Sequence, residues 1–123
     1  MTAVRKFPCR PGAVAQARSF VRDVLSDQPM DITDAAELMT SELTANCVRH
    51  AGTEFELAIE ADTQIRIEVQ DSGPGEPMLL SPPHSAATGR GLQIVDKLAD
   101  EWGITPREDG KAVWFTLRSS RSR

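Results

Sequence analysis

Asp71 is the residue whose position most clearly calls for chemistry. Residues 64–70 alternate polar and apolar, and Ile65, Ile67 and Val69 fall on one face of the predicted strand. Asp71 is the next residue on that apolar face. Burying an unpaired carboxylate is costly, so Asp71 needs a partner, which is either internal or a ligand. A carboxylate at the end of a strand, in an apolar pocket, can accept a hydrogen bond from an exocyclic amine such as that of adenine.

The glycines that follow Asp71 in the motif DSGPG, Gly73 and Gly75, allow two interpretations. Asp, Gly and Pro are all turn formers, so the motif could be a plain turn. Glycines also let a flat base approach the backbone closely. Turn chemistry explains the glycines but leaves the inward orientation of Asp71 unexplained, which favours a binding role.

Two polar residues, Glu42 and Asn46, lie one turn apart on the same side of a predicted helix. Such a pair is often only the exposed edge of an amphipathic helix. These two flank the apolar stripe, however, so they could face a cleft beside the core. Glutamate can serve as a general base, and the side-chain oxygen of asparagine suits Mg²⁺.

A third polar segment, Gly89-Arg90-Gly91-Leu92, directly precedes a predicted helix. Glycine-rich loops at helix N-termini can bind phosphate through backbone N–H groups and the helix dipole. The segment lacks the Gly-Lys-Ser/Thr of a Walker A motif, and no parallel βαβ unit precedes it. Taken alone, a plain loop at the start of a helix explains it as well.

The elements that must position these residues follow from apolar periodicity. Strands are expected over about 3–8, 55–61 and 64–71, and two more around the hairpin signal Asp109-Gly110. Helices are expected from Pro11 to about residue 25, from an N-cap at Asp31 to near Gly52, and from near Gly91 through Trp102. The order β-α-α-β-β-α-β-β predicts a two-layer α+β sandwich with a mostly antiparallel sheet.

Composition bounds the kind of protein. The 123 residues suit one compact domain spanning 1–123, with 40% hydrophobic and 26% charged residues. A net charge of −4 argues against an extended nucleic-acid interface. Cys9 and Cys47 form no zinc pattern and are expected to be reduced thiols. No run of about 18 apolar residues occurs, so a cytoplasmic protein without membrane contact is expected.

Together the three motifs ELTAN, DSGPG and GRGL resemble, in order and spacing, the N, G1 and G2 boxes of the GHKL ATPases. The closer resemblance is to the RsbW-like anti-sigma-factor/serine-protein-kinase branch. The segments SELTANCVRHA, VQDSGPG, GRGLQIVDKLADEWG and GKAVWFTL are similar to that branch, and the similarity covers nearly the whole chain.

The resemblance implies a Bergerat fold, with a mixed, mostly antiparallel sheet covered on one face by helices, and ATP and Mg²⁺ as ligands. It implies that Glu42 is the general base, that Asn46 is the Mg²⁺ ligand, and that Asp71 binds the adenine amino group. The other nucleotide-binding residues that it implies are Gly73 and Gly75 at the adenine pocket, Gly89, Arg90, Gly91 and Leu92 along the phosphates, Thr116 through a water at the adenine, and Arg49 and His50 as further candidate contacts.

Three functions remain open from the sequence. The first is a regulatory ATP-binding switch that sequesters a sigma factor and phosphorylates a serine or threonine of an antagonist protein. The second is an ATP-binding interaction module without catalysis. The third is a hydrolase, because Asp-Ser-Gly after an apolar strand also marks aspartic proteases, and a dimer could pair two Asp71 residues. Those proteases are nearly all β, whereas this chain predicts three helices. A homodimer through the N-terminal strand or first helix is also plausible.

Overall fold

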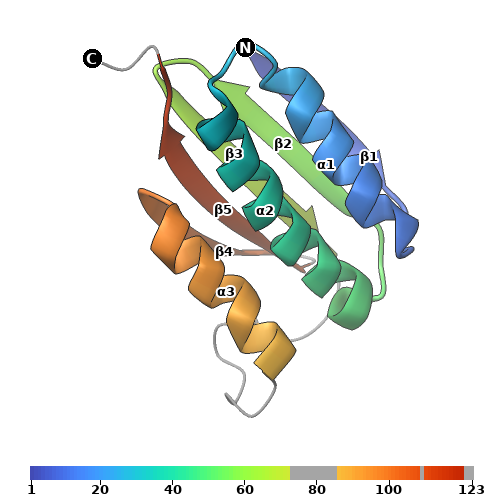
Figure 1. The fold of residues 1–123 in the computed structure, drawn as a ribbon. Coiled ribbons are helices and arrows are strands. Elements are labelled where there is room, and N and C mark those ends of the chain that lie inside the picture. The colour runs from blue at the N-terminus through green and yellow to red at the C-terminus, as the bar shows by residue number, and fades with distance from the viewer. Residues whose placement is uncertain (73–85, 109, 121–123) are drawn as a thin grey trace.

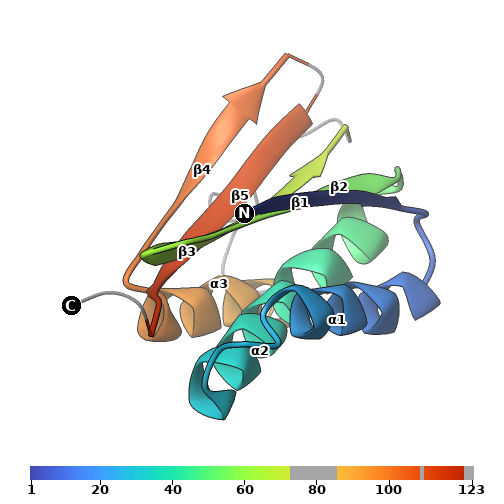
Figure 2. The same ribbon diagram turned by 90° about the horizontal axis from the view of Figure 1, so that it is seen from above.

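In the part of the chain that the structure describes, five strands form one sheet and three helices cover one of its faces (Figures 1 and 2). This computed structural model describes residues 1–72, 86–108 and 110–120, without the side chains of residues 50, 51 and 86–91. The elements are β1 (Thr2–Phe7), α1 (Gly12–Val24), α2 (Met30–Asn46) continued by η1 (Cys47–Ala51), β2 (Phe55–Ala61), β3 (Gln64–Asp71), α3 (Ala86–Leu98), β4 (Glu101–Arg107) and β5 (Gly110–Arg118). The predicted two-layer α+β sandwich and its element order are confirmed.

The sheet has the strand order β1-β2-β3-β5-β4. Each of its four described strand pairs is antiparallel, so the parallel pair that a mixed sheet would contain is not found among them. In the central pairs, Asp71 lies opposite Phe55 on β2 and opposite Lys111 on β5. The register therefore brings a second charged side chain next to Asp71.

The core lies between the helices and the sheet. Because successive residues of β2, β3 and β5 point to opposite faces, every second side chain faces the helices. Most of these inward side chains are apolar, and they pack against the apolar stripes of the helices. The phenyl rings of Phe7 and Phe55 stack with their centroids 5.3 Å apart at one end of this core. The fully buried core side chains include Ala17, Val21 and Leu25 near or on α1, Ala36 and Met39 on α2, and Leu57, Ile59, Ile65, Ile67 and Phe115 on the sheet.

The second helix ends in a widened turn. After Asn46 the chain makes one π-helical turn, η1, and Gly52 ends it in the left-handed conformation with φ 70°. The predicted glycine C-cap is thereby confirmed. Single π-turns inside helices often accompany functional sites, and this one follows directly after Asn46. No helix in the described part of the chain is long and apolar enough to cross a membrane.

Three predicted boundaries differ from the structure. Asp31 is in the first turn of α2 rather than at its N-cap, because Pro29, with ψ 152°, is the N-cap and the helix begins at Met30, two residues earlier than predicted. Helix α3 begins at Ala86, five residues before Gly91, because a helix tolerates an internal glycine at a cost of about 1 kcal/mol. Trp102 lies on β4, where its indole N–H donates to Asp96 Oδ1 across 2.8 Å.

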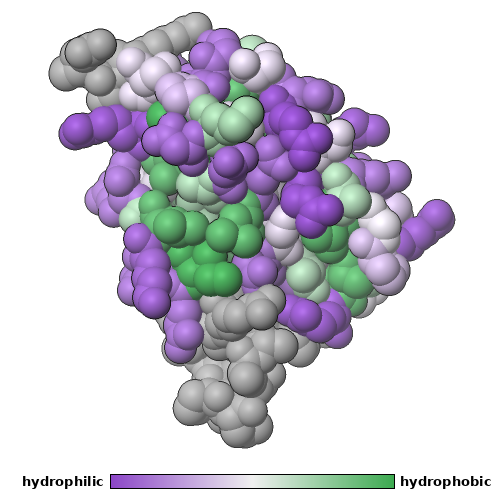
Figure 3. Space-filling view, viewed as in Figure 1, coloured by the Kyte–Doolittle hydropathy of each residue, from purple (hydrophilic) through white to green (hydrophobic). Residues whose placement is uncertain are grey.

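The helix-bearing face is largely hydrophilic, with apolar side chains gathered over α2 and α3 (Figure 3). Leu38 of α2 and Leu98 of α3 are among the large apolar side chains that remain exposed. Beneath this part of the face, the two helices approach the ends of β3 and β5 (Figure 1). Asn46, Asp71 and Leu92, three of the residues that the sequence marked for chemistry, line a pocket there.

Candidate functional site

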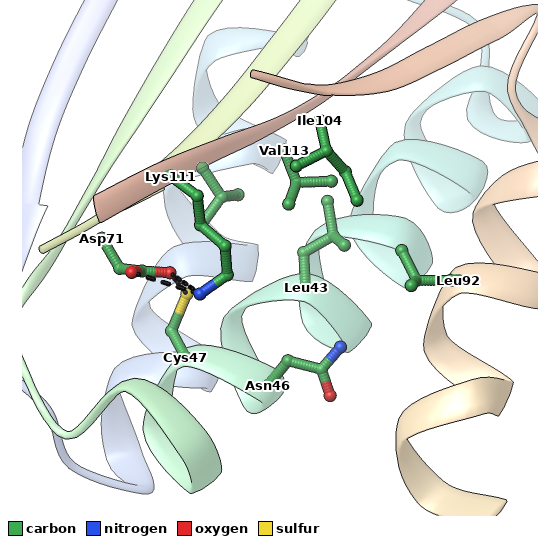
Figure 4. Close-up of a pocket in the computed structure, with 9 residues that line it drawn as sticks. Leu43, Asn46, Cys47, Asp71, Leu92, Ile104, Lys111 and Val113 are labelled. Carbon is green, nitrogen blue, oxygen red and sulfur yellow. Dashed lines mark hydrogen bonds and ion pairs between the residues drawn. The ribbon is translucent and has the colours of Figure 1, made fainter. Parts of the chain in front are cut away.

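A narrow pocket opens between α2, α3 and the sheet, with a cavity volume of about 20 Å³. A cavity of this volume has room for about one water, so a larger ligand would enter only after the lining side chains move apart. Its walls are mainly apolar. The polar side chains of Cys47, Asp71 and Lys111 lie together at one end (Figure 4). The lining residues are Leu43, Asn46, Cys47, Val69, Asp71, Leu92, Ile104, Lys111 and Val113.

Asp71 reaches this pocket because of the alternation of β3. Ile65, Ile67 and Val69 face the helices and are buried, and Asp71 continues the same face at the end of the strand. Its side chain is almost completely buried, with 4% of the residue exposed. The orientation of Asp71 inferred from the sequence is therefore the one that the structure shows.

The carboxylate of Asp71 has partners from two other elements (Figure 4). Lys111 Nζ, from β5, lies 3.1 Å from Oδ2 and 3.4 Å from Oδ1. Cys47 Sγ, from η1, donates to Oδ2 across 3.7 Å. A buried carboxylate is tolerated when it is paired and hydrogen-bonded, and these contacts supply both conditions.

Lys111 is the functional candidate that sequence reasoning missed. It is 9% exposed and lines the pocket. The signal was the same as for Asp71: Val113, Phe115 and Leu117 alternate on the inward face of β5, and Lys111 is the preceding residue on that face. Both strands thus carry a charged residue at a core-facing position, and the antiparallel register makes the two opposite neighbours.

Cys47 remains a thiol in this environment. Burial raises the pKa of its side chain far above the ordinary range, and the negative charge of Asp71 raises it further. The S–H group is therefore retained at neutral pH and serves as a weak donor to the carboxylate. A buried neutral thiol of this kind is chemically inert compared with a reactive cysteine.

Asn46 stands at the other side of the pocket. Its side chain extends from the end of α2 into the space in front of α3 (Figure 4), and the residue is 7% exposed. The amide oxygen Oδ1 accepts a hydrogen bond from Arg49 Nη2 across 3.1 Å. Glu42, one helical turn earlier, is half-buried and does not line the pocket. The structure thus joins Asn46 to Arg49 on the side of the pocket away from Asp71, and Glu42 is not among the residues that line it.

Thr116 is not brought to the pocket. It lies opposite Arg66 on the register of β3 and β5, so it is on the sheet face turned away from the helices. Its hydroxyl donates to the carbonyl oxygen of Glu101 across 3.4 Å. Its expected contact with adenine through a water conflicts with this geometry, because odd-numbered residues of β5, from Lys111 to Leu117, occupy the inward face.

The remaining expected residues are only partly described. Leu92, on α3, is buried and lines the pocket. Gly89, Arg90 and Gly91 lie within α3 rather than in a loop before it, and their side-chain surroundings are outside the described residues. The side chain of His50 and both Gly73 and Gly75 also lie outside the described residues. Their expected roles at the phosphates and the adenine remain predictions.

The fold and site define a class of α+β domain in which helices cover one face of an antiparallel sheet and a pocket with a buried carboxylate lies between the layers. The chain belongs to the histidine kinase-like ATPase domain family, whose profile matches residues 7–117. This finding confirms the resemblance to the ATP-binding GHKL domains. No curated protein matches the chain in sequence.

Solved structures of low sequence identity share the fold. The structure of the RsbU and RsbW domains of Rv1364c from Mycobacterium tuberculosis matches 99% of this chain with a TM-score of 0.76 and 19% identity. A blue-light activated histidine kinase, EL346 from Erythrobacter litoralis, matches 94% with a TM-score of 0.60 and 19% identity. The chain spans 33% of the first of these proteins and 43% of the second. The histidine kinase AdeS from Acinetobacter baumannii matches 96% of this chain, and the match covers 68% of AdeS, with a TM-score of 0.59 and 14% identity.

Proposed function

We propose that this domain binds ATP and Mg²⁺ and works in the cytoplasm as a regulatory protein kinase. It would transfer the γ-phosphoryl group to a serine or threonine of an antagonist protein and would sequester a sigma factor. The observation that carries the proposal is the nearly buried carboxylate of Asp71 at the polar end of an otherwise apolar pocket. Family membership supports ATP as the ligand.

The chemistry of the pocket lining suits a purine whose exocyclic amine is directed toward Asp71. A carboxylate accepts hydrogen bonds only, so it favours a ligand atom that carries N–H groups. Apolar side chains from both layers, including Leu43 of α2 and Val113 of β5, would pack against the faces of the base. Pockets of this kind combine mostly apolar walls with a few polar groups that fix orientation.

Asn46 and Glu42 would act at the phosphate end. Mg²⁺ keeps several waters and phosphate oxygens as ligands, so the amide oxygen of Asn46 suffices as a single protein ligand. Arg49, which donates to that oxygen, fixes the orientation of the amide. In the transfer, the acceptor hydroxyl oxygen bonds to the γ-phosphorus while the bond to the ADP oxygen breaks. Glu42 would take the hydroxyl proton, and positioning supplies most of the remaining catalysis.

The proposed protein partners follow from the RsbW-like branch. The most extensive structural match reported above contains an RsbW domain, which supports this branch through the fold. A second copy of the chain is a further candidate partner, because β1 lies at one edge of the described sheet and Val4 on it is 55% exposed. Unpaired edge strands can add another strand.

A second function, an ATP-binding module without catalysis, is favoured by one observation. Glu42, the candidate base, is not among the residues that line the pocket. Such a module would use nucleotide only to set the conformation that its partner recognises. Both functions require ATP binding, and only the first requires phosphoryl transfer.

One experiment separates these functions. The protein is incubated with γ-labelled ATP, Mg²⁺ and partners recovered from the native cell by pull-down, while ATP affinity is measured by calorimetry. ATP binding with label transferred to a serine or threonine of a recovered partner supports the kinase. ATP binding without transfer to any recovered partner supports the module. Absence of ATP binding contradicts both.

A further inference from the structure

The ammonium group of Lys111 occupies the position next to Asp71 where the amine of the ligand is expected. Its ammonium nitrogen is within 3.4 Å of both carboxylate oxygens, and its side chain lines the same pocket (Figure 4). The ion pair is deeply buried, with 9% of Lys111 and 4% of Asp71 exposed. A ligand amine that approaches Asp71 therefore meets a donor already in place.

We propose that Lys111 is an internal competitor for the nucleobase, so that its ammonium must leave the Asp71 carboxylate when the base amine binds. This inference rests on the proposed function, because it concerns the same base site. It assigns to Lys111 a role in setting nucleotide affinity.

The competition follows from the chemistry of the two donors. An ammonium group and an exocyclic amine both offer N–H groups, and a carboxylate accepts from either. The ammonium is charged, so its hydrogen bond is stronger than that of a neutral amine. Replacing the ammonium by the exocyclic amine separates a buried ion pair. The free-energy cost of that separation lowers the affinity for the nucleotide.

Lysine is suited to such an exchange. Its charge sits at the end of a flexible four-carbon stem, so the ammonium can move while the backbone of β5 stays paired with β3. The contact at Oδ2 is shared with the Cys47 thiol, which can remain on the carboxylate during the exchange. The exchange of donors at Asp71 therefore requires rotation of the Lys111 side chain and no rearrangement of the sheet.

The test compares two ligands on three proteins. The ligands are ATP and purine riboside 5′-triphosphate, which lacks the exocyclic amine. The proteins are the parent, Lys111→Met, which removes the charge from a side chain of similar length, and Lys111→Arg, which keeps a cation. Calorimetry gives the affinities, and a melting scan shows that each protein is folded.

Competition predicts that Lys111→Met binds ATP at least fivefold more tightly than the parent, whereas its affinity for the amine-free triphosphate changes less than twofold. A loss of stability alone would not produce this dependence on the amine. Lys111→Arg should bind ATP within about threefold of the parent. Equal or weaker binding of ATP by folded Lys111→Met overturns the inference, as does an equal gain for both ligands.

A second variant keeps the test decisive if Lys111→Met does not fold. Lys111→Gln is neutral and can still hydrogen-bond to Asp71, so it should show the same amine-dependent gain; its absence in that folded variant overturns the inference. A parent that binds ATP while the variants show no gain overturns the inference alone. A parent and variants that bind neither triphosphate overturn the proposed function as well.

Discussion

The thiol of Cys47 lies 3.7 Å from Asp71 Oδ2, although 24 positions separate the two residues in the sequence. This contact joins the π-helical turn after α2 to the end of β3. Among the described residues, Cys47 has the most strongly raised pKa, and its thiol lies directly against the carboxylate proposed to bind the nucleobase. The polar end of the pocket is thus built as one connected group of thiol, carboxylate and ammonium.

The first prediction concerns pH and Cys47. Because its pKa is raised in the folded state, the folded protein holds the thiol proton more tightly than the unfolded chain. The resulting stabilisation of the folded protein is fully present at pH values below the unfolded pKa of about 8.5. It is lost as the pH rises above that value, by up to about 1.4 kcal/mol per pH unit. Urea unfolding at pH 7, 9 and 10 should show a steeper decline for the parent than for Cys47→Ala. Parallel declines would contradict the assignment.

The second prediction concerns Asp71→Asn. The amide keeps the size but directs a donor toward the base amine and leaves Lys111 without its anion. We expect ATP affinity to fall at least tenfold and the free energy of unfolding to fall by about 3–5 kcal/mol, the usual cost of breaking a buried pair. Calorimetry and urea unfolding measure the two effects. Asp96→Asn, on the surface of α3, is the matched control and should retain ATP affinity. Unchanged ATP affinity in Asp71→Asn would remove Asp71 from the base site.

The third prediction concerns the metal. Asn46→Ala should abolish most of the gain in ATP affinity that Mg²⁺ gives the parent, because it removes the proposed protein ligand. Arg49→Ala is the informative control, since it removes the hydrogen bond to Asn46 Oδ1 but leaves that oxygen present. Titrations with and without Mg²⁺ measure the difference. An equal gain from Mg²⁺ in the parent and in Asn46→Ala would place the ligand elsewhere.

The fourth prediction tests whether Glu42 acts as the general base rather than as a nucleotide-binding residue. Glu42→Gln should leave ATP affinity within a few-fold and slow transfer to the antagonist protein by about 10²-fold, within the range that a general base contributes. Glu37→Gln is the control on the same helix, where Glu37 pairs with Arg22 on α1. Single-turnover transfer of label gives the rates. A Glu42→Gln protein that transfers as fast as the parent would exclude Glu42 as the base.

The fifth prediction concerns Gly110, which begins β5 next to Lys111. A Cβ atom there would overlap the carbonyl oxygen of Asp71 and lie 2.8 Å from Ser72 Cα. Gly110→Ala must push β5 away from β3 at the site, so we expect a loss of about 1–3 kcal/mol in stability and weaker ATP binding. Gly12→Ala, at the start of α1, meets no atom within 4 Å and should be neutral or slightly stabilising. Equal melting temperatures for the two variants would contradict this expectation.

Local pattern was sufficient for much of the fold. Alternation in residues 64–71 predicted both the strand and the inward side chain of Asp71, because successive residues of a strand point to opposite faces. Gly52 marked the end of the second helix, since its left-handed conformation favours glycine. Boundaries at Asp31, Gly91 and Trp102 were wrong because caps and helix ends depend on how the chain continues.

By itself, the sequence determined the element order, the inward carboxylate and the motifs that identify the family, all of which are encoded within short segments. Only the tertiary structure decided which side chains meet. The register of β3 and β5 places Lys111 opposite Asp71 and turns Thr116 to the other face of the sheet. A shift of one residue in that register would reverse both placements, and register is set by the packing of the whole inward face against the helices rather than by either strand alone.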